Sequence, residues 1–361
     1  MAHRIARRSP LYVAAPALLA LVIAACGGDD DPSTAEPPAG DDESDAEASG
    51  PMTQEEICAA GAEEGGFVHW HNHNPENIEP IYDAFNEVYP DIEPRQQEMT
   101  PDDAAQRVLT EHLAGQGVPA DIMAGQADVF AALVSEGMQD TELDWTEYGV
   151  PEDVVHSANM IRIHRIALGL GYNTDALSPE DLPNTWEELI DEKWRGDVIV
   201  DPRGRPFDQM SLLWGNDDAI DFIERLQDVV APLVIEGGTA GLVAVAGGEA
   251  DITTGGRSAE ILEQQADGVP LEMKYLDIVP TIDNYNLVLT DAENINAARC
   301  YAIWFSTAGG QELYNELEFK TNDTIPTAAP DGAQVVTVET DEEAEAVSEI
   351  GREMGRIWTG Q

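Results

Sequence analysis

The sequence predicts an α/β protein made of two lobes. Along the chain, short apolar segments with the character of strands alternate with amphipathic helices, which is the arrangement of sheets flanked by helices. The stretch 160–173 is mostly apolar and alternates little, as in a strand buried on both faces. A second apolar stretch, 276–290, carries the chain back. We expect these two stretches to cross between the lobes, near 163–173 and 278–288, as a two-strand hinge.

Residues 1–25 have the features of an export signal. The apolar core over 11–25 is shorter than the roughly 20 residues that a bilayer span needs. It ends in Ile-Ala-Ala-Cys, which resembles a bacterial lipobox. This resemblance implies cleavage before Cys26 and a lipid on that cysteine, which would anchor the protein to the membrane. An ordinary signal peptide with an incidental cysteine is the alternative. The positive charges before the core are Arg4, Arg7 and Arg8.

Residues 26–51 are almost entirely Gly, Asp, Glu, Ser, Pro and Ala. A segment of this composition cannot bury enough apolar surface to fold, so we expect a disordered acidic tether. A flexible coil of this length spans roughly 25–30 Å, and repulsion between its charges extends it. The tether would hold a folded body away from the membrane surface.

Lobe 1 is expected to comprise residues 52–165 and 282–361. A strand from Phe67 leads through a polar loop to a helix over 77–89, whose apolar residues recur at i, i+3, i+4 and i+7. Strand, loop and amphipathic helix are the usual opening of an α/β lobe. Further helices are expected at 53–62, 102–114, 127–136, 294–306, 311–317 and 341–358, with a short strand at 120–125. The sequence does not determine on which lobe the last of these helices packs.

Lobe 2 is expected to comprise residues 166–281. Its first part begins with a buried strand and continues into a short helix, which Thr185 and Glu188 can begin as a capping box. A second apolar strand, Asp-Val-Ile-Val-Asp, stops at Pro202. Helices at 209–214, 217–230 and 257–265 and a strand at 250–254 follow.

The segment 171–202 also resembles a known family. It contains Gly-Tyr-Asn-Thr, Leu-Pro-Asn-Thr-Trp-Glu-Glu-Leu, Asp-Glu-Lys-Trp-Arg-Gly-Asp-Val and a closing Asp-Pro. In these motifs it resembles the substrate-binding lipoproteins of ABC importers, in the group of ferric-ion, thiamine and aminoethylphosphonate binders. The resemblance extends from about Gly66 to about Ala329. It implies a monomeric clamshell of the type 2 periplasmic-binding-protein fold, which takes a small solute between its lobes and delivers it to an ABC permease.

Net charge restricts the partners. The 361 residues include 70 Asp and Glu against 18 Lys and Arg, a formal net charge of −52. Such a chain repels nucleic acid and anionic lipid, so neither is expected as a partner. A solvated acidic surface adapted to high salt, where charges are strongly screened, is the simplest explanation of this acidity.

Four loops are expected to face one another across a cleft. In open α/β lobes, ligands lie beyond the carboxyl ends of strands and at helix N-termini. Loops 71–74 and 125–128 belong to lobe 1, and loops 203–208 and 253–258 belong to lobe 2. The candidate ligand-binding residues are His71, Asn72, His73, Asn74, Gln126, Arg203, Arg205, Gly255, Gly256, Arg257 and Ser258, with Tyr285 on the returning strand.

The arginines favour an anionic or small organic solute. An arginine beside a Gly-Gly helix start offers a planar fork and free backbone N–H groups, which suit a carboxylate or phosphonate. The alternative for Arg203, Arg205 and Arg257 is that each pairs with one of the many acids nearby. Tyr285 packs either on the ligand or in the core.

A metal site is the second interpretation. His69, His71 and His73 alternate, so they share one face of a strand, although His69 lies deep enough to be a core residue. Ferric-binding relatives use two adjacent tyrosines of lobe 2, and the matching segment 252–262 has none. Capture of a metal ion by His71 and His73 remains open, as does, more distantly, a surface metallo-enzyme. No cofactor or enzyme activity is expected, because the sequence contains no Gly-x-Ser-x-Gly, His-Glu-x-x-His or phosphate-loop motif.

Two cysteines remain beside Cys26. Outside the cytoplasm, two thiols in one chain tend to be oxidised, so we expect a disulfide between Cys58 and Cys300. It would join the N-terminal helix to the helix that contains Arg299 and Tyr301. Two separately buried thiols are the alternative.

Overall fold

The computed structural model describes residues 51–307, 309–323, 326 and 328–360. The expected signal peptide, Cys26 and all of the expected tether except Pro51 lie outside the described residues. Among the described residues, no helix combines the length and the apolar composition that crossing a bilayer requires.

Lobe 1 is built on three parallel strands. Strand β1 (Gly66–His71) pairs in parallel with β2 (Glu93–Glu98) and with β3 (Ile122–Gly125). The largest buried side chains include Phe67, Phe85 and Tyr301, which pack ring against ring. The helices of this lobe are α1 (Gln54–Glu64), α2 (Pro75–Val88), α3 (Pro101–Leu113), α4 (Ala127–Ser135), α9 (Ile295–Thr307) and α10 (Gly310–Glu318), with short 3-10 turns at Trp145–Tyr148 and Glu152–Val154.

Helix α2 illustrates how the local sequence sets an element. Asn74 is its N-cap and accepts a hydrogen bond from the Glu76 amide, while Pro75 occupies the first turn, where its missing N–H costs nothing. Ile78, Ile81 and Phe85 are buried, so the expected apolar stripe is the face that packs on the lobe.

Lobe 2 has a second group of strands. Strand β5 (Val198–Val200) pairs in parallel with β6 (Leu233–Val234) and with β7 (Ile252–Arg257). Its core contains Trp186, Phe207 and Phe222. The other elements are α5 (Phe207–Trp214), α6 (Asn216–Val230), α7 (Gly238–Ala246), α8 (Ser258–Ala266), β8 (Leu271–Lys274) and short 3-10 turns at Glu187–Leu189 and Glu192–Trp194.

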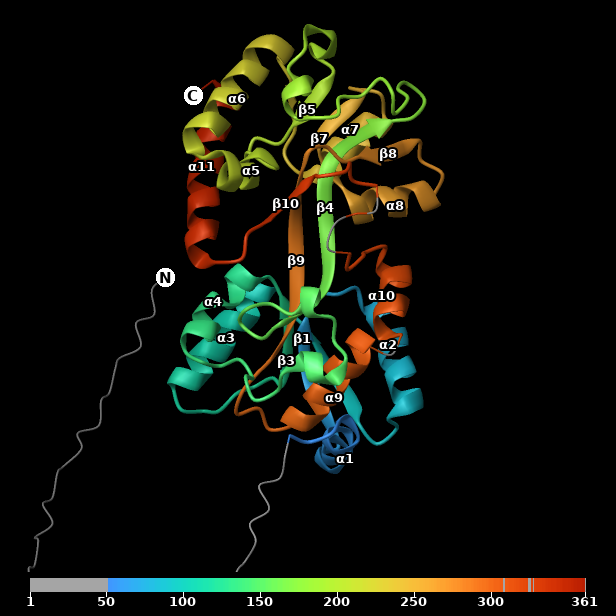
Figure 1. Ribbon diagram of the computed structural model, residues 1–361, viewed down its shortest axis with the longest axis vertical. Coiled ribbons are helices and arrows are strands. Elements are labelled where there is room, and N and C mark those ends of the chain that lie inside the picture. Colours follow the sequence, from blue (N-terminus) through green and yellow to red (C-terminus); the bar gives the residue numbers. More distant parts are fainter. Residues whose placement is uncertain (1–50, 308, 324–325, 327, 361) are drawn as a thin grey trace, which may run out of the picture. The chain divides into compact units, whose positions relative to one another are not determined.

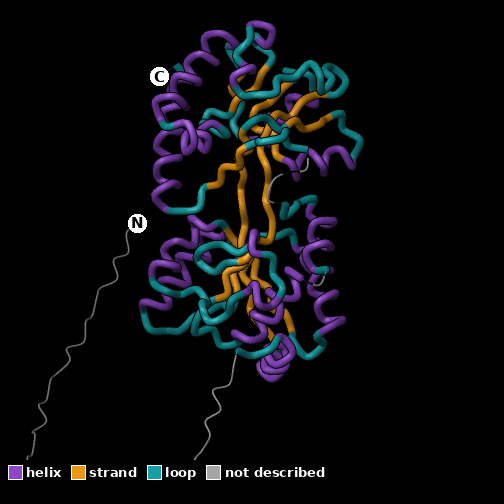
Figure 2. Tube along the Cα trace, in the orientation of Figure 1, coloured by secondary structure: helices purple, strands orange, loops and turns teal. Residues whose placement is uncertain are grey.

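Two long strands connect the lobes, as the sequence predicts. Strands β4 (Ile161–Asn173) and β9 (Ile278–Val288) are antiparallel neighbours, and every residue of β4 is buried. Sheet order is β2-β1-β3-β9-β4-β7-β5-β6, so one hydrogen-bonded path passes through both lobes by way of this pair. Figure 1 shows β4 and β9 side by side, and Figure 2 shows helices on both sides of the strands.

The end of the chain departs from the expected domain boundaries. Strand β10 (Gln334–Thr337) pairs with the first residues of β9, and α11 (Asp341–Thr359) packs on α5 and α6 (Figure 1). Ile350, Met354 and Trp358 belong to the core of lobe 2. The expectation that all of 282–361 returns to lobe 1 is therefore wrong for this last segment. The helical spacing of its apolar residues predicts a helix with one buried face. It does not predict which lobe packs on that face.

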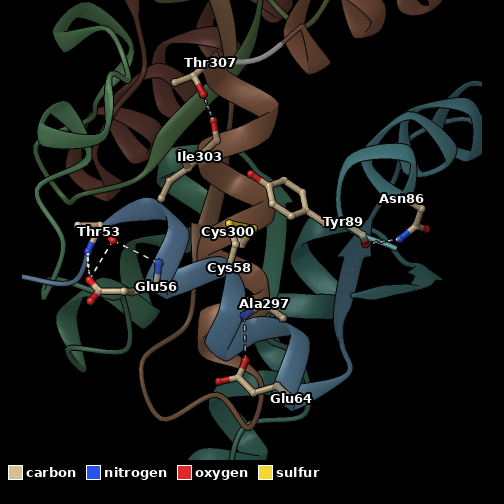
Figure 3. Close-up of a disulfide and its surroundings, with 10 residues drawn as sticks. All are labelled: Thr53, Glu56, Cys58, Glu64, Asn86, Tyr89, Ala297, Cys300, Ile303 and Thr307. Atoms are coloured by element: carbon tan, nitrogen blue, oxygen red, sulfur yellow. Dashed lines mark hydrogen bonds between the residues drawn. A yellow bond between two sulfur atoms is a disulfide. The ribbon is translucent and has the colours of Figure 1, made fainter. Parts of the chain in front are cut away.

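The disulfide joins the first and the ninth helix. Cys58 of α1 and Cys300 of α9 are bridged with an S–S distance of 2.04 Å (Figure 3). Close packing surrounds the bridge, because a Cβ at Gly61 would lie 2.7 Å from the Cα of Ala297. The Glu64 carboxylate also accepts a hydrogen bond from the Ala297 amide at 2.8 Å, which ties the end of α1 to the start of α9.

Candidate functional site

Residues of both lobes line two adjoining pockets. The first, here the α8–α10 pocket, has a volume of about 540 Å³ and is lined by the loop after β1, by α8 and by the end of α10. The second, here the α5–α11 pocket, has a volume of about 850 Å³ and is lined by residues 202–209 and by α11. Gln126 and Ile282 line both pockets, so the two pockets share part of their walls.

The α8–α10 pocket brings together five of the predicted residues. Lobe 1 contributes the loop after β1 and the N-cap residue of α4, and lobe 2 contributes the residue that precedes α8. The loop and helix starts expected to converge across a cleft therefore line one pocket. The five residues are Asn72, His73, Asn74, Gln126 and Arg257.

Charges of both signs line this pocket. Arg257 forms an ion pair with Glu260 at 3.0 Å, and Lys320 forms one with Glu318 at 2.6 Å. Glu318 also accepts a hydrogen bond from the Asn77 amide group at 2.9 Å. One cation thus comes from each lobe, and each is held by a carboxylate that leaves other N–H groups for a solute.

A tyrosine hydroxyl connects two buried histidines at the pocket. The Tyr314 hydroxyl lies 2.8 Å from Nδ1 of His164 and 3.3 Å from Nδ1 of His73. Burial lowers the pKa of both histidines well below the usual range, and the charge of Lys320 lowers it further. Since a hydroxyl has one proton, it can donate to only one imidazole and must accept from the other. The two neutral rings therefore have opposite tautomers.

The α5–α11 pocket contains the other two predicted arginines. Nη2 of Arg203 lies 2.6 Å from Asp201, and Nε of Arg205 lies 3.9 Å from Asp208. Burial raises the pKa of Asp208 to about 6, with the Arg205 charge acting in the opposite direction. Arg203 is thus firmly paired, whereas Arg205 is only loosely held.

His71 does not line either pocket, contrary to expectation. Its side chain is buried, its Nε2 lies 3.1 Å from the Gln96 side-chain oxygen, and its Nδ1 accepts a hydrogen bond from the His73 amide. Both ring nitrogens are therefore used to hold the loop. Metal binding by His71 would break these bonds. Among the described residues, no three His, Cys, Asp or Glu side chains are grouped as metal ligands.

The glycine pair and Ser258 also have structural roles instead of the expected ones. Gly255 and Gly256 are residues of β7 that directly precede Arg257, the N-cap of α8, and Gly256 packs so closely on β4 that a Cβ would lie 2.5 Å from the Gly171 amide nitrogen. The Ser258 hydroxyl accepts a hydrogen bond from the Ala167 amide. None of the three lines either pocket.

Tyr285 is a hinge residue packed in the core of lobe 1. It is 3% exposed, its ring lies 5.1 Å from that of His156, and its hydroxyl donates to Asp283 at 3.4 Å. Of the two positions considered for Tyr285, the core position is the observed one.

Several lining residues escaped the sequence analysis. His164 lies in β4 between other polar residues of the strand, Arg162 and Arg165, so its residue type alone did not mark it. Lys320 is one of three lysines in the chain, which was a usable signal. The arginines of α11 were missed because the helix was placed on the other lobe. The missed residues that line the pockets include Asn77, His164, Asn284, Lys320, Arg352 and Arg356.

Comparison with known proteins identifies the fold and the family. Residues 73–312 match the family model described as bacterial extracellular solute-binding protein. Iron-bound HitA from Pseudomonas aeruginosa superposes with a TM-score of 0.63 at 17% identity, covering 80% of this chain and 99% of that chain. The Atu4243-GABA receptor superposes with a TM-score of 0.63 at 15% identity, covering 81% and 97%. AfuA from Actinobacillus pleuropneumoniae, with fructose-6-phosphate bound, gives 0.56 at 18% identity, covering 82% and 98%. No curated protein matches this chain.

Proposed function

Since the chain belongs to the family of bacterial extracellular solute-binding proteins, we propose that it is the lipid-anchored solute receptor of an ABC importer. The receptor works outside the cytoplasm, and its partner is a permease in the membrane. Cys26 carries the anchor and residues 26–51 the tether. The folded part acts as a monomer that captures one small solute and presents it to the permease.

The solute is an anionic or zwitterionic organic molecule. Arg257 of lobe 2 and Lys320 of lobe 1 line the same pocket, and this is the observation that carries the proposal. Basic residues are rare in a chain with 70 acids against 18 bases, so two at one pocket are a specific feature. Among the structural neighbours, GABA has a carboxylate and fructose-6-phosphate a phosphate, and both are chemically compatible with these cations.

Neutral polar groups complete the recognition. Asn72, Gln126 and the pair His73 and His164 supply donors and acceptors that orient the uncharged part of a solute. Because the two histidines have opposite tautomers, they offer different hydrogen-bonding patterns to the same molecule.

Capture requires the two lobes to respond to the solute. Both contribute lining residues, and β4 and β9 are the strands that connect them. A solute that contacts Arg257 and Lys320 at once stabilises the closed arrangement of the lobes, and it shifts the equilibrium only by its preference for that arrangement. The permease then recognises the closed receptor.

A ligand screen tests the proposal. Thermal shift would be measured with carboxylates, phosphonates, amino acids, polyamines and ferric salts, followed by titration calorimetry of each hit. We expect Arg257→Ala to weaken binding of the anionic hit at least tenfold, with the melting temperature of the free protein nearly unchanged. Arg225→Ala, which removes an exposed arginine of α6, is the matched control.

The screen also separates the alternatives. Stabilisation by ferric salts alone, abolished by a chelator, would replace the organic solute with a metal ion. Unchanged affinity of Arg257→Ala for the organic hit would remove this pocket as the binding site.

A further inference from the structure

Helix α11 carries two arginines among mostly acidic charged residues. Its sequence has six acidic residues and two basic ones, Arg352 and Arg356. Both arginines line the α5–α11 pocket, whereas none of the five glutamates of the helix does, in the part of the chain that the structure describes. Glu349 and Glu353 each lie three residues before an arginine, yet only the arginines line the pocket. This difference indicates a negative group in the pocket.

The two arginines have no acidic partner among the described residues. Arg352 donates through Nε to the Ser348 carbonyl of its own helix at 3.2 Å, and both side chains are exposed. Acids outnumber bases 70 to 18 in the chain, so partners would be easy to supply. The guanidinium groups of Arg352 and Arg356 therefore keep N–H donors for a bound molecule.

Other groups already compensate aspartates that line the same pocket. Asp283 accepts a hydrogen bond from Nε of Arg165 at 2.7 Å and lies 3.7 Å from Arg162. Asp102 lies in the first turn of α3, where the helix dipole stabilises a negative charge. Asp208 lies 3.9 Å from Arg205, and Asp128 lies in the first turn of α4. Arg352 and Arg356 are thus not needed to neutralise these four carboxylates.

Close packing fixes α11 against the loop that carries Arg203 and Arg205. A Cβ at Gly351 would lie 2.6 Å from the carbonyl oxygen of Arg203, and a Cβ at Gly355 would lie 2.5 Å from that of Pro202. Arg352 and Arg356 directly follow these two glycines in the sequence, so the contacts that seat the helix also place its arginines at the pocket.

We propose that Arg352 and Arg356, together with Arg205, form a second anion-binding site in the α5–α11 pocket. The site takes a carboxylate or phosphate group, so the solute of this receptor has at least two anionic groups. This inference depends on the proposed solute-binding function. The α8–α10 pocket, with Arg257 and Lys320, holds one anionic group, and α11 contributes the binding of the other in the adjoining pocket.

Matched pairs of solutes test the second site. Dicarboxylates and phosphorylated carboxylates would each be compared with the analogue that lacks one anionic group, by titration calorimetry at fixed ionic strength. We expect wild type to bind the best doubly anionic member at least tenfold more tightly than its analogue. The double variant Arg352→Gln/Arg356→Gln should lose most of this advantage and bind the singly anionic analogue as wild type does.

Three further variants make the result specific. Arg225→Gln removes a paired arginine from α6 and should leave the tenfold ratio intact, because it removes a positive charge without touching the pocket. Glu353→Gln, on α11 but outside the pocket lining, should also leave it intact. Arg352→Lys/Arg356→Lys should keep part of the advantage, since the charge remains and only the planar fork is lost.

The outcomes distinguish this inference from the proposed function. Suppose that Arg257→Ala abolishes binding while Arg352→Gln/Arg356→Gln keeps the full affinity ratio between doubly and singly anionic solutes. The proposed receptor function is then supported and the second site is wrong. A wild type that binds only singly anionic solutes also overturns the second site. If wild type binds no solute of any class, both proposals fall.

Discussion

The disulfide between Cys58 and Cys300 should be a major contributor to stability. We expect the double variant Cys58→Ala/Cys300→Ala to fold, because the contacts between α1 and α9 do not depend on sulfur. The Glu64 carboxylate still accepts a hydrogen bond from the Ala297 amide, and Gly61 still packs against the Ala297 backbone. The variant should nevertheless unfold at a clearly lower denaturant concentration.

The magnitude follows from the size of the loop. The bridge joins positions 242 residues apart. In the chain-entropy model, releasing a loop of this length makes the unfolded state more favourable by about 5.5 kcal/mol at 25 °C. Unfolded chains retain some compactness, which reduces the gain. We therefore expect the free energy of unfolding to fall by about 2–5 kcal/mol.

Urea denaturation of the oxidised wild type and the double variant measures this difference. Fluorescence reports both lobes, since Trp304 belongs to the core of lobe 1 and Trp186 to that of lobe 2. Mass spectrometry must show the wild-type bridge intact. A loss below about 1 kcal/mol with an unchanged denaturant slope would show that loop closure is not what the bridge contributes. The single variant Cys58→Ala should lose as much as the double variant.

Two further predictions concern pH and the packing of α11. Burial lowers the pKa of His69, His73 and His164, so the unfolded state takes up protons first as the pH falls below the usual histidine pKa, and stability should decrease from about pH 6.5 downward. In urea titrations, His164→Gln should reduce the slope of unfolding free energy against pH between 5 and 6 by up to about 1.4 kcal/mol per pH unit, and an unchanged slope would contradict the assignment. Gly355→Ala should lower the melting temperature, because a Cβ 2.5 Å from the Pro202 carbonyl costs about 1–3 kcal/mol, more than the roughly 1 kcal/mol gained in helix propensity. Glu349→Ala on the exposed side should not lower it; equal behaviour of the two variants would refute the close contact.

The sequence predicted the parts of the fold that depend on local pattern. The family expected from 171–202 is confirmed by the match over 73–312, and the two crossing stretches correspond to β4 and β9. These features are recognisable because strands buried on both faces are mostly apolar, and because the apolar stripe of α2 has a helical period. The return of the chain to lobe 2 through β10 and α11 was missed, because a strand of four residues carries too little pattern to be identified.

Prediction of the site was limited by contacts between distant residues. The loops with Asn72, Gln126 and Arg257 could be placed because ligands bind beyond strand ends. The helix start after Gly255 and Gly256 was predicted to within one residue, but the packing of Gly256 on β4 was not, because the pairing of β7 with β4 joins segments distant in sequence. His71 was misassigned for a similar reason: its partner Gln96 lies on the neighbouring strand, and no local pattern indicates that bond.

The position of α11 has a consequence for how the chain is made. The core of lobe 2 includes Trp358, which lies three residues before the last position of this chain, together with Ile350 and Met354. During synthesis, the ribosome must therefore add about 150 residues after Phe207 before α11 can pack on this part of the core. A premature stop at residue 340 would leave the apolar face of lobe 2 open to water, and we expect such a product to aggregate or be degraded even though the strands of both lobes are complete.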